Sequence, residues 1–398
     1  MSFSDHFSIQ NIPYGIATSS SHPQKAVATR LHDHVFFLGD LPIQTSEDIK
    51  QAFAHTTLNA LARTPKDKLR ELRSALQKVF ADEQTVKKYG VPVEQVELHL
   101  PFEVKGFTDF SCSKQHLLNA GEASTGRRML PPASVYYPIG YGGRASSVRV
   151  SGTPVVRPYG VYHQDGGEGV TFGPSQGLDF ELEMAAVIGK PSNFGERVAV
   201  KDADDHIFGL VLLNDWSARD VQKLEMMQLG PNNSKSFHTS ISPWIVTLEA
   251  LEPFETSPPP KETPAAAFLQ DPKEKSSYNI SLSVDVIRNG VSSTVCKAQL
   301  AWMYWTFRDL VAQQTINGCN VNTGDLLATG TVSGLEDHEH GCLLETTMGG
   351  KKSIKLSDGQ DLVWLRDGDE AMLTGFCGDG VGFGDVTGVI APATLFEA

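Results

Sequence analysis

Two different periods of hydrophobic residues divide the chain near residue 100. In the segment SEDIKQAFAHTTLNALARTPKDKLRELRSALQKVF, which starts at residue 46, apolar residues recur every three or four positions. This spacing predicts two amphipathic helices that are separated at Thr64-Pro65. The residues before the segment alternate short apolar runs with turn residues, which is typical of a few short strands. We therefore expect a small N-terminal domain over residues 1–100, with its boundary between Pro92 and Pro101.

The remaining residues, 101–398, are rich in glycine and in strand-like alternation. Every second residue from Ile280 to Val286 is apolar and Asn289-Gly290 follows, which predicts a β-hairpin. The segments DFELEMAAVIG, HIFGLVLLND and SPWIVTL also have the composition of strands, whereas AWMYWTFRDLVAQQ predicts a helix. The proline-rich stretch from Glu255 to Ser277 predicts an exposed loop. The predicted fold class is therefore mainly β (α+β), with a larger, mainly-β domain after the small one.

The composition narrows the possible functions of this chain. Its 398 residues suggest two or three domains, and 40% hydrophobic with 20% charged residues is ordinary for a globular protein. The 47 acidic and 34 basic side chains give a net charge of −13, which repels phosphate groups and argues against nucleic acid as a partner. Five scattered cysteines, no signal-peptide pattern and no apolar run of about 18 residues predict a cytoplasmic protein with buried free thiols and no membrane contact.

Two glutamates, Glu181 and Glu183, occupy alternate positions of the strand-like segment LDFELEMAAVIG. Residues i and i+2 of a strand point to the same face. Two carboxylates on one face among apolar neighbours repel each other unless a cation lies between them. The alternative is a strand with one solvated face, and the apolar residues on both sides of the pair argue against it.

Two further groups of polar residues are candidates for the same site. Asp215, Arg219 and Gln222 are spaced to share one face of a helix, and the alternative is an ion pair on a solvated helix. Asp109 and His116 are seven residues apart and would also share a helical face, although Asp109 alone could be a helix cap and a single histidine is often structural. Ligation by carboxylate oxygens would favour Mg²⁺ or Ca²⁺ over zinc, and the candidate ligands are Asp109, Glu181, Glu183 and Asp215.

The residues around these candidates resemble the fumarylacetoacetase family. The matching stretches run from residue 9 to near the C-terminus and are IQNIPYG, FTDF with SKQH, IGYGGRASS with VSGTPVVRP, LDFELEMA, HIFGLVLLNDWSARD, KSFHTSISPW, MYWT, NGCNVNTGDLLATGTVSG and DGDEAMLTG. The resemblance implies an SH3-like N-terminal domain, a catalytic domain built as a mixed β-roll, and a homodimer. It also implies hydrolysis of a carbon–carbon bond in a 1,3-diketone acid, the last step of tyrosine breakdown.

The resemblance also implies a role for each candidate residue. Metal ligation falls to four carboxylates, with a lysine and a threonine lining the same site: Asp109, Glu181, Glu183, Asp215, Lys235 and Thr239. His116 corresponds to the general base and Glu345 to the carboxylate that orients it. The groups that stabilise developing negative charge are Arg219, Gln222 and Lys235, and those that contact the substrate are Tyr141 and Thr331.

Three positions depart from the pattern of the tyrosine-pathway enzymes. Ser111 and Met226 stand where tyrosines are expected, and Thr125-Gly126 stands where Arg-Gly is expected. In the family these positions hold the distal end of the substrate, including a terminal carboxylate, so we expect Ser111, Arg127 and Met226 to line that end here. Losing a charge-assisted hydrogen bond costs about 1.5–3 kcal/mol, which predicts that fumarylacetoacetate is a poor substrate and that a related acylpyruvate is preferred. Arg127 or Arg128 would compensate if the loop is shifted.

Two other functions stay open for this sequence. The wider superfamily also contains lyases and isomerases, such as decarboxylases and tautomerases, that use a similar metal site. A binding protein that keeps the fold without catalysis is the third possibility. The pair of His116 and Glu345 favours hydrolysis, because water activation is the step that such a pair serves.

Overall fold

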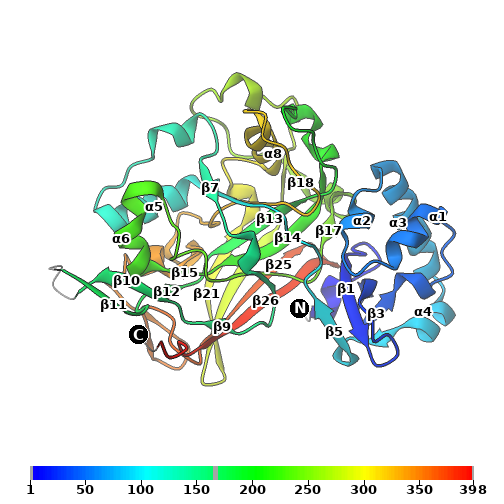
Figure 1. Cartoon of the computed structure of the whole chain (residues 1–398), viewed down its shortest axis with the longest axis horizontal. Coiled ribbons are helices and arrows are strands. Elements are labelled where there is room, and N and C mark those ends of the chain that lie inside the picture. Colours follow the sequence, from blue (N-terminus) through cyan, green and yellow to red (C-terminus); the bar gives the residue numbers. More distant parts are fainter. Residues whose placement is uncertain (1–2, 165–168, 397–398) are drawn as a thin grey trace.

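The N-terminal part of the chain forms an antiparallel sheet covered by helices (Figure 1). The computed structural model describes residues 3–164 and 169–396. The strand order is β4-β3-β2-β1-β5, with β1 (Tyr14–Ser19), β2 (Ala26–Leu31), β3 (His34–Phe37), β4 (Val91–Pro92) and β5 (Val96–His99). Between β3 and β4 the chain forms α1 (Glu47–Phe53), α2 (Asn59–Ala62), α3 (Lys66–Phe80) and α4 (Glu83–Tyr89). Short strands followed by helices are therefore confirmed.

The helices in this region are shorter than the periodicity predicts. The break at Thr64-Pro65 is confirmed, because α3 begins directly after the proline and turns its leucines toward the core. The segment before the break is divided into α1 and α2, since the Leu58 N–H donates to the Pro101 carbonyl at 2.8 Å and leaves the helical pattern. After α3, Asp82 caps a separate helix, α4, by accepting the Gln84 N–H at 3.1 Å.

The rest of the chain builds two large sheets that pack face to face, and several two-stranded ones. The larger has the order β7-β6-β22-β13-β14-β16-β8, with β17 paired to β14, and the second has the order β21-β20-β25-β26-β9. The first contains β6 (Phe107–Phe110), β7 (Gly140–Gly142), β8 (Val148–Val150), β13 (Leu182–Ile188), β14 (Ile207–Asp215), β16 (Thr239–Ile241), β17 (Val246–Thr247) and β22 (Leu326–Ala328). The second contains β9 (Val155–Val156), β20 (Ser281–Arg288), β21 (Val291–Gln299), β25 (Glu370–Cys377) and β26 (Val381–Ala391). The mainly-β (α+β) fold class is confirmed.

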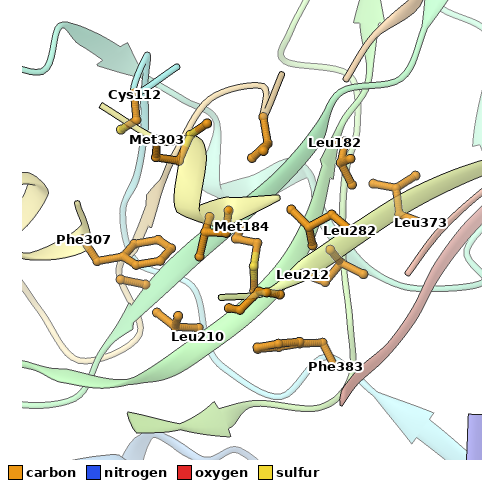
Figure 2. Close-up of a cluster of buried hydrophobic side chains, with 14 of the residues drawn as sticks. Cys112, Leu182, Met184, Leu210, Leu212, Leu282, Met303, Phe307, Leu373 and Phe383 are labelled. Carbon is orange, nitrogen blue, oxygen red and sulfur yellow. The ribbon is translucent and has the colours of Figure 1, made fainter. Parts of the chain in front are cut away.

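Apolar side chains from both sheets fill the space between them. Figure 2 shows Leu182 and Met184 of β13 and Leu212 of β14 beside Leu282 of β20 and Phe383 of β26. These side chains are buried, so the two sheets share one core. Burial of a leucine-sized side chain stabilises the folded state by about 1.5–3 kcal/mol, and this core therefore fixes β13 and β14 firmly.

The predicted hairpin is confirmed in detail. β20 and β21 are antiparallel neighbours joined at Asn289 and Gly290, whose φ angles are 51° and 78°. Both residues thus adopt the left-handed conformation that a type I′ turn requires, which is why Asn-Gly is favoured there. Side chains along β20 alternate between buried and half-buried, as the spacing from Ile280 to Val286 predicts.

Three other predicted elements differ in extent. The helix expected over residues 301–314 is α8 (Phe307–Thr315), which begins late because Thr306 and Asp309 form a capping box at its start. The segment SPWIVTL contributes only the two residues of β17, followed by α7 (Leu248–Leu251). The proline-rich stretch is a loop whose ends pair as β18 (Glu255–Thr256) and β19 (Ser277–Tyr278). The short strands β23 (Ile354–Lys355) and β24 (Asp361–Leu362) form another pair.

Strands β13 and β14 are covered on both faces. The face away from the second sheet packs on the N-terminal domain, in a core that joins Ile16 to Val187 and Val211. Reciprocal hydrogen bonds between the backbones of Tyr14 and Ile245, at 2.9 and 2.8 Å, fix the contact. Every residue of both strands is consequently buried. The boundary near residue 100 stays a prediction.

Each of the five cysteines is a free thiol. Four of them are buried, as expected, but the prediction is wrong for Cys319, which lies exposed after α8. The cytoplasmic location that was inferred from these thiols stays a prediction. No helix in the described part of the chain has both the length and the apolar composition needed to cross a membrane.

Candidate active site

Four carboxylates meet where the strands of the larger sheet end. Asp109 lies on β6, Glu183 on β13 and Asp215 at the last position of β14, while Glu181 precedes β13 and forms an isolated bridge with Cys342. An oxygen of each carboxylate lies within 4.8 Å of an oxygen of the others. All four side chains are at least 96% buried. A solvated strand face for Glu181 and Glu183 is therefore wrong.

One cation and two hydroxyl groups hold part of this cluster. The Lys235 ammonium contacts both Glu181 and Asp215, at 3.0 Å to the latter. The Thr239 hydroxyl donates to Asp215 Oδ1 at 2.7 Å, and the Tyr141 hydroxyl donates to its Oδ2 at 3.3 Å. The structure thus brings Lys235 and Thr239 to the carboxylates, as the resemblance implies, and it also brings Tyr141, which was expected to contact the substrate.

The remaining carboxylate oxygens have the properties of cation ligands. Both oxygens of Glu183 and Oδ1 of Asp109 are buried without a hydrogen-bond partner among the described residues. Burial and the neighbouring charges raise the pKa of Asp109 to about 7 and raise the pKa of Glu183 well above its ordinary value. Burial also acts to raise the pKa of Glu181, but Lys235 and Arg219 outweigh it and lower that pKa. An all-oxygen donor set with unpaired carboxylates fits a hard divalent cation.

A histidine–glutamate pair lies next to the carboxylates. His116 is on α5 (Lys114–Thr125) and its Nδ1 is 2.7 Å from Oε1 of Glu345, which is on α9 (Leu343–Thr346). Burial tends to lower the pKa of His116, but the charge and hydrogen bond of Glu345 raise it above its usual value. Burial tends to raise the pKa of Glu345, yet His116 brings it down to about 2. The ionised Glu345 must accept from Nδ1–H, which leaves Nε2 free to take a proton.

Asp109 and His116 do not share a helical face. Asp109 is a strand residue, and α5 starts only at Lys114 after Ser113, whose hydroxyl accepts the His116 N–H at 3.1 Å. Ser113, rather than Asp109, is therefore the helix cap. The residues from Asp109 to His116 form the end of a strand, a short turn and the first turn of a helix. Their separation by seven positions therefore matches the spacing of one helical face only by coincidence.

Asp215 was also predicted to share a helical face with Arg219 and Gln222, and this is wrong because Asp215 ends a strand. Arg219 and Gln222 do lie together on one helix, α6 (Arg219–Leu229). Arg219 is fixed on three sides: Nε donates to Asp179 Oδ2 at 2.8 Å, Nη1 donates to Gln222 Oε1 at 2.9 Å, and Nη2 is 2.7 Å from Glu181 Oε1. A solvated ion pair is excluded, because these carboxylates are buried.

Three polar residues that sequence reasoning missed complete the site. Glu345 also accepts hydrogen bonds from the Ser333 hydroxyl at 2.7 Å and from Asn119 Nδ2 at 2.9 Å. The third residue, Asp179, is fully buried against Arg219. Two local signals were available: Asn119 follows His116 by three residues in a helix, and Asp179 precedes Glu181 by two.

The substrate-contact candidates fall into two groups. Thr331 is buried and its hydroxyl has no partner among the described residues, and Ser111 is half-buried beside a small cavity. Met226 is 48% exposed on α6 and Arg127 is exposed after α5.

Arg127 or Arg128 was predicted to replace the arginine expected at position 125, and in this structure Arg128 is held by other partners. Thr125 is the last residue of α5, and its hydroxyl accepts the Arg127 N–H at 3.3 Å. Arg128 donates to Asn119 Oδ1 at 2.7 Å and to Glu122 at 3.0 Å. Its guanidinium therefore lies along α5.

Comparison with known proteins gives this site a context. Residues 10–101 match the family model described as Fumarylacetoacetase N-terminal, and residues 105–390 match Fumarylacetoacetate (FAA) hydrolase C-terminal. Fumarylacetoacetase of Arabidopsis thaliana is 41% identical over 98% of this chain and 96% of the relative. The rat enzyme, from Rattus norvegicus, is 38% identical over 97% and 96%.

Solved structures support the fold alone, because their sequences are distant. The fumarylacetoacetate hydrolase of Exiguobacterium antarcticum superimposes with a TM-score of 0.54 at 15% identity, over 96% of this chain and 99% of that one. Cg1458 gives 0.53 at 15% identity, over 96% and 100%. Both family models together span nearly the whole sequence, and the chain belongs to the fumarylacetoacetase family.

Proposed function

We propose that this chain is a metal-dependent hydrolase that cleaves a carbon–carbon bond in a 1,3-diketone acid such as fumarylacetoacetate, a step of tyrosine catabolism. The observation that carries the proposal is the buried carboxylate cluster beside a histidine–glutamate pair. The cluster suits a divalent cation and the pair suits water activation. The family of the chain and the names of its relatives support the same reaction.

Mg²⁺ or Ca²⁺ is the cation that we propose for the cluster, with Asp109, Glu181, Glu183 and Asp215 as ligands. When bound, a divalent cation polarises the carbonyl oxygens of a chelating diketone. Lys235 and Thr239 hold two of the ligands through Glu181 and Asp215. Among the described residues, the positive side chains paired with these four carboxylates are Lys235 and Arg219, and Arg219 is shared with Asp179. Uncompensated negative charge therefore remains for a divalent ion to balance.

In the proposed reaction, His116 takes a proton from water through Nε2, and the resulting hydroxide attacks one carbonyl carbon of the diketone. Glu345 stabilises the imidazolium that forms. Arg219, Gln222 and Lys235, which lie beside the carboxylates, would donate to the developing oxyanion. The bond between this carbon and the central carbon then breaks, its electron pair forms an enolate, and the imidazolium returns a proton to the central carbon. The products are one carboxylic acid and one methyl ketone.

A lyase or isomerase with a similar metal site is the second candidate. Such an enzyme moves a proton or releases CO₂ without consuming water. The Glu345-oriented histidine favours hydrolysis instead, because its free Nε2 is suited to deprotonating a water molecule.

Removal of the metal should abolish turnover. We expect the purified protein to hydrolyse fumarylacetoacetate, to lose activity on dialysis against EDTA, and to regain it with Mg²⁺ or Ca²⁺, measured by loss of diketone absorbance. Glu183→Gln removes a carboxylate that has no hydrogen-bond partner among the described residues, so the affinity of the protein for the cation should fall at least about tenfold by calorimetry. Glu94→Gln, an exposed carboxylate, is the matched control. EDTA-resistant turnover would contradict the proposal.

The rate should depend on the protonation of His116. The base acts when neutral, so kcat falls as the pH drops through its pKa, and Glu345 places that acid limb above the usual histidine value of 6.5. Glu345→Gln removes the charge that raises the pKa and should move the limb to lower pH. His116→Ala should lower kcat by about 10²–10⁴ while leaving metal binding intact, with His338→Ala, an exposed histidine, as control. Wild-type turnover by His116→Ala would assign the base elsewhere.

The substrate should differ at its distal end from that of the tyrosine-pathway enzymes. Arg128 already donates to Asn119 and Glu122, and Met226 cannot donate a hydrogen bond to a carboxylate. The comparison compound is an acylpyruvate whose acyl end carries no carboxylate. We expect kcat/KM for fumarylacetoacetate to show none of the roughly ten- to hundredfold advantage that a bound carboxylate at that end would give. Parallel kinetics on both compounds measure this. A large preference for fumarylacetoacetate that disappears in Arg127→Ala would show compensation by that arginine.

We also propose a homodimer, joined through an exposed hairpin patch that consists of Val161, Val170, Phe172 and Phe396. Val161 and the other hairpin residues lie on β10 (Tyr159–His163) and β11 (Val170–Pro174), which form a sheet of their own. The rings of Phe172 and Phe396 are 5.5 Å apart, and both side chains are more than half exposed. The hairpin packs on α6 through Gly160 and Val221, but its other face carries these exposed apolar side chains. Exposed aromatic patches mark interfaces, so a second copy is the partner that we propose.

Light scattering after size exclusion tests the dimer. The wild type should elute at about twice the mass of one chain, and Phe172→Ser should shift the equilibrium toward one chain because it removes apolar area from the patch. Phe194→Ser is a matched control, since Phe194 is 90% exposed and lies outside the patch. An unchanged mass in Phe172→Ser, or a monomeric wild type at micromolar concentration, would contradict this interface.

A further inference from the structure

We infer that Asp179 is a positioning residue that holds the two halves of the active site in register. One half, the base arm, is the pair His116 and Glu345, and the other, the oxyanion arm, is the pair Arg219 and Gln222. Asp179 contacts both arms through a single carboxylate. The inference rests on the proposed function, which assigns the two arms to one reaction.

The backbone places Asp179 between the two arms. It lies on β12 (Leu178–Asp179), which pairs with β15 (Ser217–Ala218), so that Asp179 is opposite Ser217, two residues before Arg219. On the other side, the Leu182 N–H donates to the Gly341 carbonyl at 2.9 Å, and Glu181 bridges Cys342. The residues around Asp179 therefore lie between the start of α6 and the start of α9.

The carboxylate of Asp179 has donors from both arms. Its Oδ1 accepts the backbone N–H of Leu343 at 2.7 Å, and its Oδ2 accepts the N–H of Leu344 at 2.9 Å. The same Oδ2 accepts Arg219 Nε at 2.8 Å. The side chains of Asp179 and Arg219 are 0% and 4% exposed, so bulk water has little access to replace a missing bond.

These bonds fix Arg219, which would stabilise the oxyanion, and Glu345, which orients the base His116. Leu343 and Leu344 are the first residues of α9, a single turn that carries Glu345. Arg219 keeps its contacts to Gln222 and Glu181 without Asp179, but its Nε would lose the acceptor that sets the plane of the guanidinium. Loss of the carboxylate should thus turn the guanidinium and shift Glu345 relative to His116 at the same time.

A neighbouring carboxylate provides the control for a purely structural role. Asp220 is the next residue of α6 after Arg219, and it ties the helix to the turn between β11 and β12. It accepts the Ser175 hydroxyl and the Gln176 N–H, both at 2.6 Å. Asp220→Asn therefore weakens the anchoring of α6 while leaving both arms with their own partners.

The test compares Asp179→Asn with Asp220→Asn in the full-length, metal-loaded enzyme. The readouts are thermal stability, kcat and KM, the acid limb of kcat, and the pKa of His116 from NMR of histidine-labelled protein. For Asp179→Asn we expect kcat to fall about ten- to a hundredfold, the range known for groups that orient catalytic ligands, with KM within about threefold. The acid limb and the pKa of His116 should both move to lower pH, because Glu345 no longer lies against the ring. Asp220→Asn should show wild-type kcat and His116 pKa, whatever its stability.

Each outcome either supports or overturns the positioning role of Asp179. A folded Asp179→Asn with wild-type kcat, or with an unchanged His116 pKa, overturns the inference, as does the same shift in Asp220→Asn. If Asp179→Asn does not fold, Asp179→Glu keeps the charge but displaces the oxygens by one methylene, and it must show the same loss of kcat and the same shift. The pKa of His116 can be measured without turnover. If the wild type hydrolyses no diketone but Asp179→Asn still lowers this pKa, the proposed function is refuted while the positioning role of Asp179 stands.

Discussion

Burial of four carboxylates in one place is the constraint on which the rest of this structure depends. Asp109, Glu181, Glu183 and Asp215 repel one another, and the dry surroundings strengthen that repulsion. Lys235 touches two of them, and it compensates only part of the charge. Groups held in such an arrangement must be fixed by a rigid frame, because any freedom would let them separate or reach water. The core of β13 and β14 supplies that frame.

The N-terminal domain contributes to the site without supplying a residue to it. It covers the face of β13 and β14 that the second sheet leaves open, through apolar contacts such as Ile16 with Val211. An open face would hydrate the strands and weaken every charge interaction at their ends. Tyr14, which exchanges backbone hydrogen bonds with Ile245, continues the catalytic sheet into the smaller domain. The stability of each domain therefore depends on its contacts with the other.

Local patterns in the sequence predict local structure well and long-range contacts poorly. The turn at Asn289-Gly290 and the pairing of Glu181 with Glu183 follow from neighbouring residues, and so does the start of α3 after Pro65. The predicted helical face of Asp109 and His116 fails, because spacing alone does not reveal a strand that ends between them. The functions of Asp179 and Asn119 depend on partners more than 150 residues away. The spacing of neighbouring residues carries no information about such distant partners.

The charges of the site form a connected series of alternating sign. The series runs from Glu345 through His116 to Glu181, whose other neighbours are the cations Arg219 and Lys235. Removing one member changes the pKa of the next, so a substitution within the series alters the chemistry itself. The departures at Ser111, Thr125 and Met226 are uncharged and lie outside the series. We therefore expect them to alter contacts with the distal end of a substrate while leaving each proton and each charge of the proposed mechanism in place.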